Sequence, residues 1–232
     1  MRKILSLALL ISFLFCLCSC GNKAVEENII SNKSVIETTK EQDADGLSVE
    51  NAENAETDVS SSAYVVYFSR ADENYGVGNI EKGNTQIVAE IIGEQLKCDT
   101  FHIETVSPYP SDYDECTEVA KRELSDNARP ELTEFPDLTE YDTIFVSYPI
   151  WWGDMPMAMY TFLEHYNWNG KTIVPFVTHA GSGMSGTADN IRDICTGADV
   201  LNGLAVTGET AQNDFETTQA EVSEWLEKIN IE

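Results

Sequence analysis

The chain has 232 residues, with 40 Asp and Glu against 14 Lys and Arg, so its formal net charge at pH 7 is −26. Such a protein is repelled by nucleic acid phosphates and by anionic lipid headgroups, which argues against both as electrostatic partners. The acidic surplus is typical of a highly soluble protein, and docking to a cationic partner is the alternative.

Residues 1–19 are predicted to be a targeting segment. Arg2 and Lys3 precede the apolar run Ile4–Cys18, which is shorter than the ~20 residues that a membrane-spanning helix needs. Its end, LCSC, resembles the lipobox of bacterial lipoproteins. That resemblance implies cleavage before Cys20, a lipid on Cys20, and a location outside the cytoplasm, anchored to a bacterial cell membrane. An uncleaved anchor or a plain signal peptide is the alternative.

Residues 20–62 are predicted to be a disordered acidic tether. From Gly21 to Ser62 there is no aromatic residue, and ten acids stand against three lysines. Such a segment cannot bury enough apolar surface to offset the entropy lost on ordering. As a flexible coil it would span roughly 35–40 Å and hold the following domain off a membrane surface.

Residues 63–232 alternate apolar runs of strand length with helical patterns. Strands are predicted at Ala63–Ser69, Asp99–Glu104, Tyr141–Pro149, Lys171–His179 and around Val200–Val206. Helices are predicted at 85–96, around Tyr113–Leu124, from Met157 to about His165, at about Gly186–Cys195, and near the C-terminus, where Thr218 and Glu221 form a capping box. This alternation predicts an α/β fold with an open, doubly wound, mostly parallel sheet of five strands, although Pro175 is awkward in a central strand.

Three cysteines fall in this domain: Cys98, Cys116 and Cys195. They have no C-x-x-C spacing, so they predict neither a disulfide framework nor a metal site. We interpret them as small core residues, and the sequence leaves open whether two of them form a disulfide.

Three unusual loops follow the first, third and fourth predicted strands. Ligands of doubly wound sheets bind beyond the carboxyl ends of the strands, where the strand order reverses, so these loops share one edge. In the first loop, the hydroxyls of Ser69 and Thr85, the Asn84 amide and the N–H groups of a helix start could cradle a phosphate. A nucleotide-triphosphatase loop is excluded because no G-x-x-x-x-G-K-[ST] motif is present. The alternative is that Asn84 simply caps a helix.

The second loop, PIWWGDMP, carries adjacent tryptophans between Pro149 and Pro156. Neighbouring residues of a regular strand point to opposite faces, so Trp151 and Trp152 cannot both enter one core. A stiff loop with exposed rings suits a flat π-system, because stacking adds ~0.5–1.5 kcal/mol to burial. Core packing is the alternative.

The third loop, HAGSGMSGT, runs from His179 to Thr187 and is rich in glycine and serine. Its backbone amides could approach the carbonyls and nitrogens of a planar heterocycle. A flexible connection without a binding role is the alternative.

The motifs YFSR…GNT, SYPIWWGDMP and FVTHAGSG resemble the three flavin-contacting loops of the flavodoxin-like family, in particular its subgroup with P-x-W-W-G in the second loop. The resemblance covers Ala63–Glu232 and implies the strand order 2-1-3-4-5 of flavodoxin, with FMN at the switch point. The cofactor-binding residues that it implies are Ser69, Arg70, Gly83, Asn84 and Thr85 at the phosphate; Pro149, Ile150, Trp151, Trp152 and Gly153 at the isoalloxazine; and Gly181, Ser182 and Gly183 at its pyrimidine edge.

One departure from the family pattern lies in the first loop, where the 13 residues from Arg70 to Lys82 separate Ser69 from Gly83. The family usually runs S-x-T-G-N-T without interruption. We interpret the insertion as a lid over the flavin that carries Tyr75. The insertion leaves Arg70 only a candidate for phosphate contact.

The resemblance implies an FMN-binding electron-transfer protein without a catalytic side chain or a metal. Its partner would be a redox protein or a small electron acceptor. The alternative is an NAD(P)H-dependent flavin or quinone reductase, which would use the open face of the flavin. A lipoprotein that keeps the fold as a non-redox binding module is a third hypothesis.

Overall fold

The computed structural model describes residues 63–229 and residue 231. The predicted targeting segment, the proposed lipid-carrying Cys20 and the acidic tether lie outside the described residues. Within the described part, no helix combines the length and the apolar character needed to cross a membrane.

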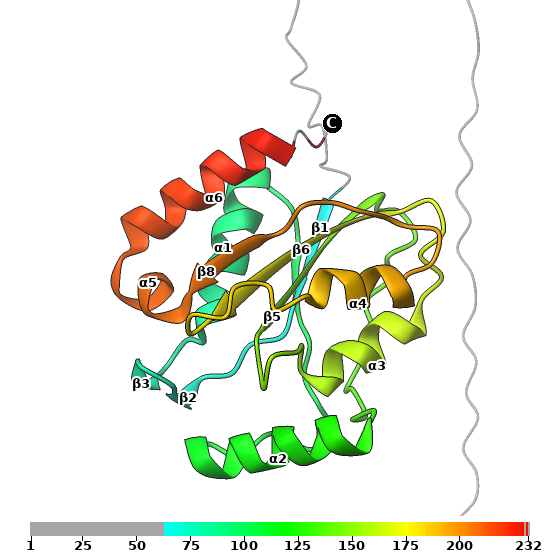
Figure 1. The fold of residues 1–232 in the computed structure, drawn as a ribbon. Coiled ribbons are helices and arrows are strands. Elements are labelled where there is room, and N and C mark those ends of the chain that lie inside the picture. Colours follow the sequence, from blue (N-terminus) through cyan, green and yellow to red (C-terminus); the bar gives the residue numbers. More distant parts are fainter. Residues whose placement is uncertain (1–62, 230, 232) are drawn as a thin grey trace, which may run out of the picture. The chain divides into compact units, whose positions relative to one another are not determined.

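A six-stranded parallel sheet lies at the centre of the domain (Figure 1). Its order is β4-β1-β5-β6-β7, and β8 pairs with β6 as well. The strands are β1 (Ala63–Tyr67), β4 (Thr100–His102), β5 (Thr143–Pro149), β6 (Thr172–His179), β7 (Asp199–Val200) and β8 (Leu204–Thr207). With β7 and β8 as two parts of a fifth strand, the order along the chain is 2-1-3-4-5, which confirms the predicted α/β fold.

The break in the fifth strand lies beside Pro175. The Ile173 carbonyl accepts the Leu201 N–H at 2.9 Å, so Ile173 directs its backbone groups towards the fifth strand. Residues two apart in a strand face the same neighbour, and Pro175, which has no N–H, therefore faces it too. The fifth strand is interrupted there at residues 201–203, and a Cβ on Gly203 would lie 2.6 Å from the Pro175 carbonyl oxygen. The sheet thus accommodates a proline by splitting its neighbour into two strands.

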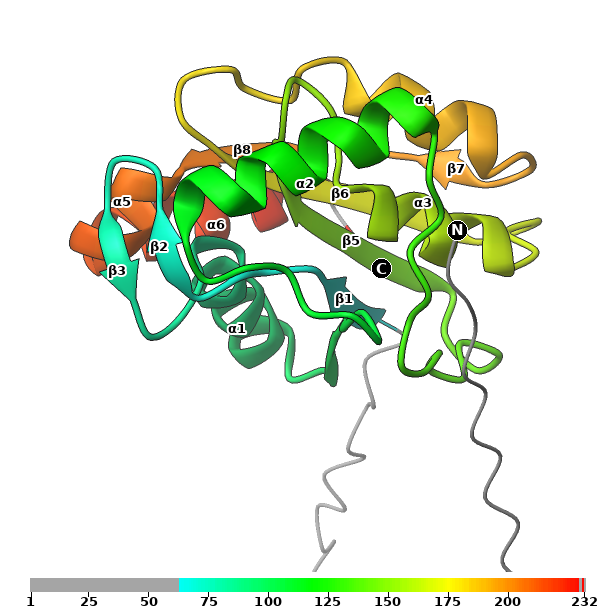
Figure 2. The ribbon, with the colours of Figure 1, turned by 90° about the horizontal axis from the view of Figure 1, so that it is seen from below.

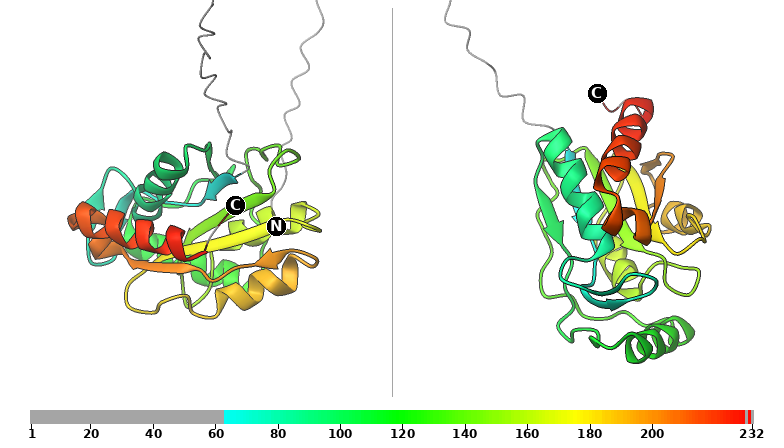
Figure 3. Two further views of the ribbon diagram at one scale, coloured as in Figure 1. Left: turned by 90° about the horizontal axis from the view of Figure 1, so that it is seen from above. Right: turned by 90° about the vertical axis from the view of Figure 1, so that its left-hand side faces the viewer.

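Helices cover both faces of the sheet (Figure 3). On one face lie α1 (Asn84–Leu96), α5 (Gly208–Asn213) and α6 (Phe215–Ile229), and on the other lie α3 (Met157–His165) and α4 (Thr187–Ile194). Helix α2 (Tyr113–Asp126) lies at the end where the central strands finish, at the bottom of Figure 1 and in the foreground of Figure 2.

The predicted insertion, residues 70–82, forms an antiparallel hairpin of β2 (Asp72–Asn74) and β3 (Gly78–Ile80). The hairpin lies at the same end of the domain as α2 (Figures 1 and 2). It therefore adds structure next to the edge of the sheet where the sequence places its ligand.

The C-terminal helices differ from the prediction. Helix α6 begins at Phe215 rather than at a capping box of Thr218 and Glu221, because the Asp214 carboxylate accepts the Thr217 N–H at 3.0 Å. Thr218 lies inside α6, and its hydroxyl donates to backbone carbonyls. Helix α5 was not predicted, because its sequence GETAQN has no apolar period.

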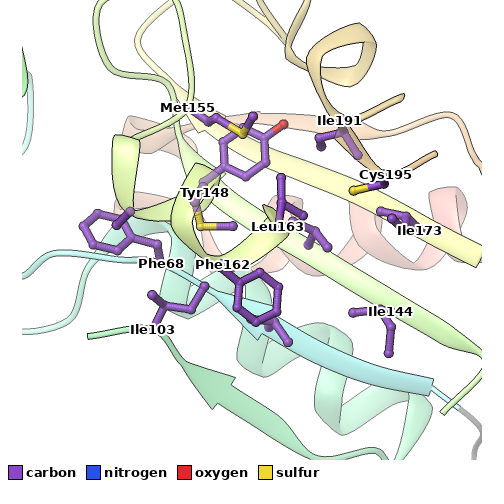
Figure 4. Close-up of a cluster of buried hydrophobic side chains, with 14 of the residues drawn as sticks. Phe68, Ile103, Ile144, Tyr148, Met155, Phe162, Leu163, Ile173, Ile191 and Cys195 are labelled. Atoms are coloured by element: carbon purple, nitrogen blue, oxygen red, sulfur yellow. The ribbon is translucent and has the colours of Figure 1, made fainter. Parts of the chain in front are cut away.

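Two buried clusters flank the sheet, because side chains of each strand alternate between its faces. Val65 and Tyr67 pack on the side of α1 and α6, whereas Val66 and Phe68 pack on the side of α3 and α4. Figure 4 shows the second cluster, with Phe162 and Leu163 of α3 over the strands. All three cysteines of the described part are free thiols; Cys116 and Cys195 are buried and Cys98 is half-buried.

Candidate functional site

A cavity of about 630 Å³ opens where the central strands end. This volume lies within the range of about 300–1,000 Å³ that is usual for small-molecule sites. The cavity brings together all three predicted loops. The predicted residues that line it are Arg70, Asn84, Pro149, Ile150, Trp151, Trp152 and Gly181.

The other predicted residues lie close to the cavity in sequence but do not line it; they are Ser69, Gly83, Thr85, Gly153, Ser182 and Gly183. Ser69 and Thr85 use their hydroxyls within the protein. The Ser69 hydroxyl oxygen accepts the Gln86 N–H at 3.1 Å, and the Thr85 hydroxyl shares a 2.7 Å hydrogen bond with that of Thr178. These hydroxyls fix the first loop to the start of α1 and to β6.

Gly83 lets the backbone of the first loop approach the start of α1. A Cβ at this position would lie 2.2 Å from the Ser69 hydroxyl oxygen and 2.6 Å from the Arg70 carbonyl oxygen. The next residue, Asn84, begins α1, and its side-chain Oδ1 is buried without a hydrogen-bond partner among the described residues. The first N–H groups of a helix also have no intrahelical partner. This corner of the cavity therefore offers both donors and an unsatisfied acceptor.

Arg70 lines the cavity, but its guanidinium holds the hairpin in place. It donates to the carbonyl oxygens of Pro110 at 3.0 Å, Ser111 at 3.1 Å, and Glu73. Its Nε is buried and has no partner among the described residues. The hydrogen bonds of the Arg70 guanidinium thus go to the protein's own backbone.

The two tryptophans differ in their surroundings. Trp151 is half-buried and meets Phe68 and Tyr109 edge-on, with ring centroids 5.4 and 5.1 Å apart. Trp152 is 53% exposed, has a φ of +54°, and donates its indole N–H to the Thr117 carbonyl at 2.9 Å. Trp151 is therefore fixed by the core while Trp152 reaches across to α2.

Asp154 fastens this loop to the helices behind it. The N–H and carbonyl of Trp151 pair with the backbone of Asp154, which closes the turn. The Asp154 carboxylate accepts hydrogen bonds from the Met155 N–H at 2.8 Å, the Tyr160 hydroxyl at 3.0 Å and the Asn190 amide at 3.0 Å. Burial and the nearby Asp154 charge raise the pKa of Tyr160 to about 12, so it remains a donor.

His179 begins the third loop and lines the cavity. Its Nδ1 accepts the Gly181 N–H at 2.9 Å, which requires that nitrogen to be unprotonated. Burial lowers the pKa of His179. The loop therefore adopts its observed turn around a neutral imidazole.

Several lining residues were not predicted as cofactor contacts. They come from the hairpin (Asn74, Tyr75, Gly76), from α2 (Tyr113, Cys116, Thr117, Ala120), from β6 and its end (Thr178, His179, Ala180), and from the start of α5 (Thr207, Gly208, Glu209). The hairpin residues belong to the proposed lid, and Thr178, His179 and Ala180 belong to the third-loop motif FVTHAGSG, whereas the residues of α2 and α5 carried no sequence signal. The described residues contain no cluster of His, Cys, Asp and Glu suited to a metal ion.

Comparisons with known proteins agree with this geometry. The family model described as Flavodoxin matches residues 78–229. A solved structure from Bacteroides eggerthii, assigned as a flavoprotein, is 26% identical with a TM-score of 0.58, and the match covers 73% of this chain and 98% of that one. A similarly assigned protein from Bacteroides uniformis is 25% identical with a TM-score of 0.57, covering 72% of this chain and 99% of that one.

A flavoprotein from Lactobacillus acidophilus, solved in complex with FMN, shares the fold at 19% identity and a TM-score of 0.50, covering 70% of this chain and 97% of that one. Comparison with curated proteins finds no match. The family match extends over more than half of the chain and includes the second and third loops. The chain belongs to the flavodoxin family.

Proposed function

We propose that this protein binds FMN in the cavity and transfers electrons through it. The observation that carries the proposal is that one cavity joins the start of α1, two indole rings and a glycine-rich turn. FMN has a phosphate and a hydroxylated chain, which suit the start of α1, and a flat ring, which suits the indole rings and the glycine-rich turn.

At one end of the cavity, backbone N–H groups suit the FMN phosphate. The N–H groups at the start of α1 favour an anion through hydrogen bonds and the helix dipole. The close approach at Gly83 brings the first loop against that helix start. The buried Oδ1 of Asn84 needs a donor, which a hydroxyl of the ribityl chain would supply. Asn84 and the amides of α1 would therefore hold the phosphate and chain, and Arg70 would act mainly through the hairpin.

At the other end of the cavity, aromatic side chains suit the isoalloxazine ring of FMN. Trp151 is held by Phe68 and Tyr109, so it presents a fixed surface rather than a mobile one. Trp152 is exposed; its indole N–H is hydrogen-bonded to α2, and the Nζ of Lys121 lies 5.1 Å from its ring centroid. These two residues would contact the isoalloxazine from the second loop, with Gly181 of the third loop at its edge.

Bound FMN would supply one- and two-electron chemistry, while the protein supplies position and electrostatics. His179 accepts a backbone N–H and is neutral, so it is not arranged as a proton donor at Nδ1. Burial raises the pKa of Cys116, so its thiol remains protonated. In this proposal the protein positions the cofactor, and the bound cofactor carries the electrons.

An FMN titration of the full chain tests the proposal. We expect bound FMN to show the absorption bands of an oxidised flavin and its fluorescence to be quenched by the indoles. Replacing both tryptophans (Trp151→Ala with Trp152→Ala) removes two stacking contacts of ~0.5–1.5 kcal/mol each and should weaken FMN binding by a factor of roughly 5–150. Phe215→Ala, an exposed ring on α6 that does not line the cavity, is the control. Unchanged affinity in the double variant would refute the proposal.

We also propose that the domain is held outside the cytoplasm by a lipid on Cys20, with residues 21–62 as a tether. The support is the charged start, the short apolar run and the LCSC ending of the sequence. Cells grown with radiolabelled palmitate should label the intact chain and not the Cys20→Ala variant. Equal labelling of both, or absence of label from both, would contradict this proposal.

A further inference from the structure

Trp151, which lines the cavity, contacts a tyrosine that does not line it. The Tyr109 ring meets the indole edge-on, with ring centroids 5.1 Å apart and an interplanar angle of 82°. Phe68 meets both rings edge-on as well, at 5.4 Å from Trp151 and 5.6 Å from Tyr109. The indole and the phenol are therefore in direct contact, which is close enough for an electron to pass between them.

The hydroxyl group of Tyr109 donates to the Glu123 carboxylate of α2 at 2.7 Å. A bond this short is typical of a hydroxyl group that donates to a charged oxygen. Burial raises the pKa of the Glu123 carboxyl group, which makes its carboxylate a better proton acceptor. Burial and the bond to Glu123 raise the pKa of Tyr109, so the phenol keeps its proton. Tyr109 thus holds its proton next to a base.

The proton acceptor matters because the loss of an electron changes the acidity of a phenol. A neutral phenol is a weak acid, whereas an oxidised phenol is a strong acid and gives its proton to any base in contact. A phenol that is bonded to a carboxylate is therefore easier to oxidise than one bonded to a carbonyl oxygen, since its proton can move as the electron leaves. Tyr109 meets this condition beside an indole.

Tyr166 has a similar aromatic contact without the proton acceptor. Its ring centroid lies 5.4 Å from that of Trp168. Its hydroxyl group donates to the Pro136 carbonyl oxygen at 2.7 Å, and an amide carbonyl does not take up a proton at neutral pH. Tyr166 therefore offers a matched comparison for Tyr109.

Tyr160 has a carboxylate partner but the opposite charge over its ring. Its hydroxyl group donates to Asp154 at 3.0 Å, and the guanidinium carbon of Arg129 lies 4.9 Å from its ring centroid. A cation over an aromatic face is stabilised by the electrons of the ring, so it opposes the loss of one of them. Tyr109 combines the carboxylate partner with an indole instead.

We propose that Tyr109 and Glu123 form a relay that transfers oxidation from the indole at the cavity to a tyrosine behind it. When a one-electron oxidant in the cavity takes an electron from Trp151, Tyr109 gives one electron to the resulting indole radical cation. The Tyr109 O–H bond breaks, and its proton forms a new O–H bond with the Glu123 carboxylate. The products are a neutral indole, a neutral tyrosyl radical and a protonated carboxyl group, and the oxidant has gained one electron. The inference rests on the proposed function only for the natural oxidant, which would be the light-excited ring of FMN.

Pulse radiolysis of the full chain without FMN tests the relay. The azide radical is the oxidant, because it removes one electron preferentially from indoles. A Trp152→Phe background leaves Trp151 as the most exposed indole, since Trp168 and Trp225 are only 2% and 7% exposed. We expect the absorption of the indole radical to decay as that of the tyrosyl radical rises, at a rate that does not depend on protein concentration.

Conservative variants separate the relay from packing. Tyr109→Phe keeps the ring against Trp151 and removes the proton, whereas Glu123→Gln keeps a hydrogen-bond acceptor and removes the base. Each should slow the transfer about tenfold or more, and Tyr166→Phe, the control, should leave the rate unchanged. The transfer should also be slower in heavy water than in ordinary water, because a proton moves with the electron.

A transfer rate that is unchanged in Tyr109→Phe would overturn the inference. Equal rates in heavy and ordinary water, or an equal loss in Tyr166→Phe, would do the same. Because the assay contains no FMN, failure of the chain to bind FMN would defeat the proposed function and leave the relay standing. Absence of the transfer from a chain that binds FMN would defeat this inference alone.

Discussion

Tyr160 of α3 donates its hydroxyl hydrogen to the Asp154 carboxylate, with oxygen–oxygen distances of 3.0 Å to Oδ2 and 3.2 Å to Oδ1. Asn190 of α4 donates to the same carboxylate and to the Tyr160 oxygen. Asp154 ends the turn that begins at Trp151. The position of the indole rings therefore depends on a polar network behind them, rather than on the loop sequence alone.

Removing the centre of this network should destabilise the protein. Asp154→Ala leaves the Tyr160 hydroxyl and the Met155 N–H without their acceptor and removes one of the two acceptors of the Asn190 amide, so we expect the free energy of unfolding to fall by about 2–3 kcal/mol. Urea denaturation measures this loss, and the FMN affinity should fall with it. Asp154→Asn keeps one acceptor oxygen and should lose less; equal losses in both variants would argue against the network.

FMN affinity, and not only stability, should depend on the close backbone approach at Gly83. Gly83→Ala places a methyl group against Ser69 and Arg70, so we expect a loss of stability of about 1–3 kcal/mol together with weaker FMN binding. Gly93→Ala, inside the helix α1 that follows Gly83, is the matched control, since its Cβ would lie 2.6 Å from the Thr100 methyl group, away from the cavity. Calorimetric titration should show normal FMN affinity for Gly93→Ala; an equal loss in both would contradict a local role of Gly83.

His179 should make stability depend on pH. Because burial lowers its pKa in the folded protein, the unfolded chain binds the proton more readily, so its stabilising contribution is complete above about pH 6.5 and declines as the pH falls. Protonation of Nδ1 would also break the bond from the Gly181 N–H. Unfolding free energies at pH 7.5 and 5.5 should differ more for the unchanged protein than for His179→Gln. The same difference in both would show that other groups account for the effect.

Arg70 should hold the hairpin in place. Removing hydrogen bonds from a charged group costs about 1.5–3 kcal/mol each, so Arg70→Ala should speed amide hydrogen exchange at residues 71–82 by about tenfold or more. Arg192→Ala, which removes an exposed ion pair with Asp189 in α4, is the control. If exchange in the hairpin is unchanged while FMN affinity falls sharply, Arg70 serves the phosphate rather than the hairpin.

The strands and the three loops could be predicted because their signals are local. β1, β5 and β6 are nearly continuous apolar runs, and parallel topology places the loops that follow them at one edge. The break at residues 201–203 could not be predicted, because it depends on which neighbour Pro175 faces. Helix α6 began earlier than predicted because Asp214, outside the apolar pattern, supplies the cap.

The unpredicted cavity residues of α2 and α5 come from segments without a motif. Tyr113 and Thr117 lie on a polar helix, and only the fold brings that helix to the ends of the strands. The Asp154 network also depends on two helices that are distant in sequence. Such contacts are set by tertiary packing, which hydrophobic periodicity does not encode.

A crystal structure of the full chain grown with FMN tests the central claim most directly. We expect electron density for one FMN per chain, with the phosphate at the start of α1 beside Asn84 and the ring against Trp151 and Trp152. FMN bound elsewhere on the domain, or a phosphate away from α1, would contradict the account.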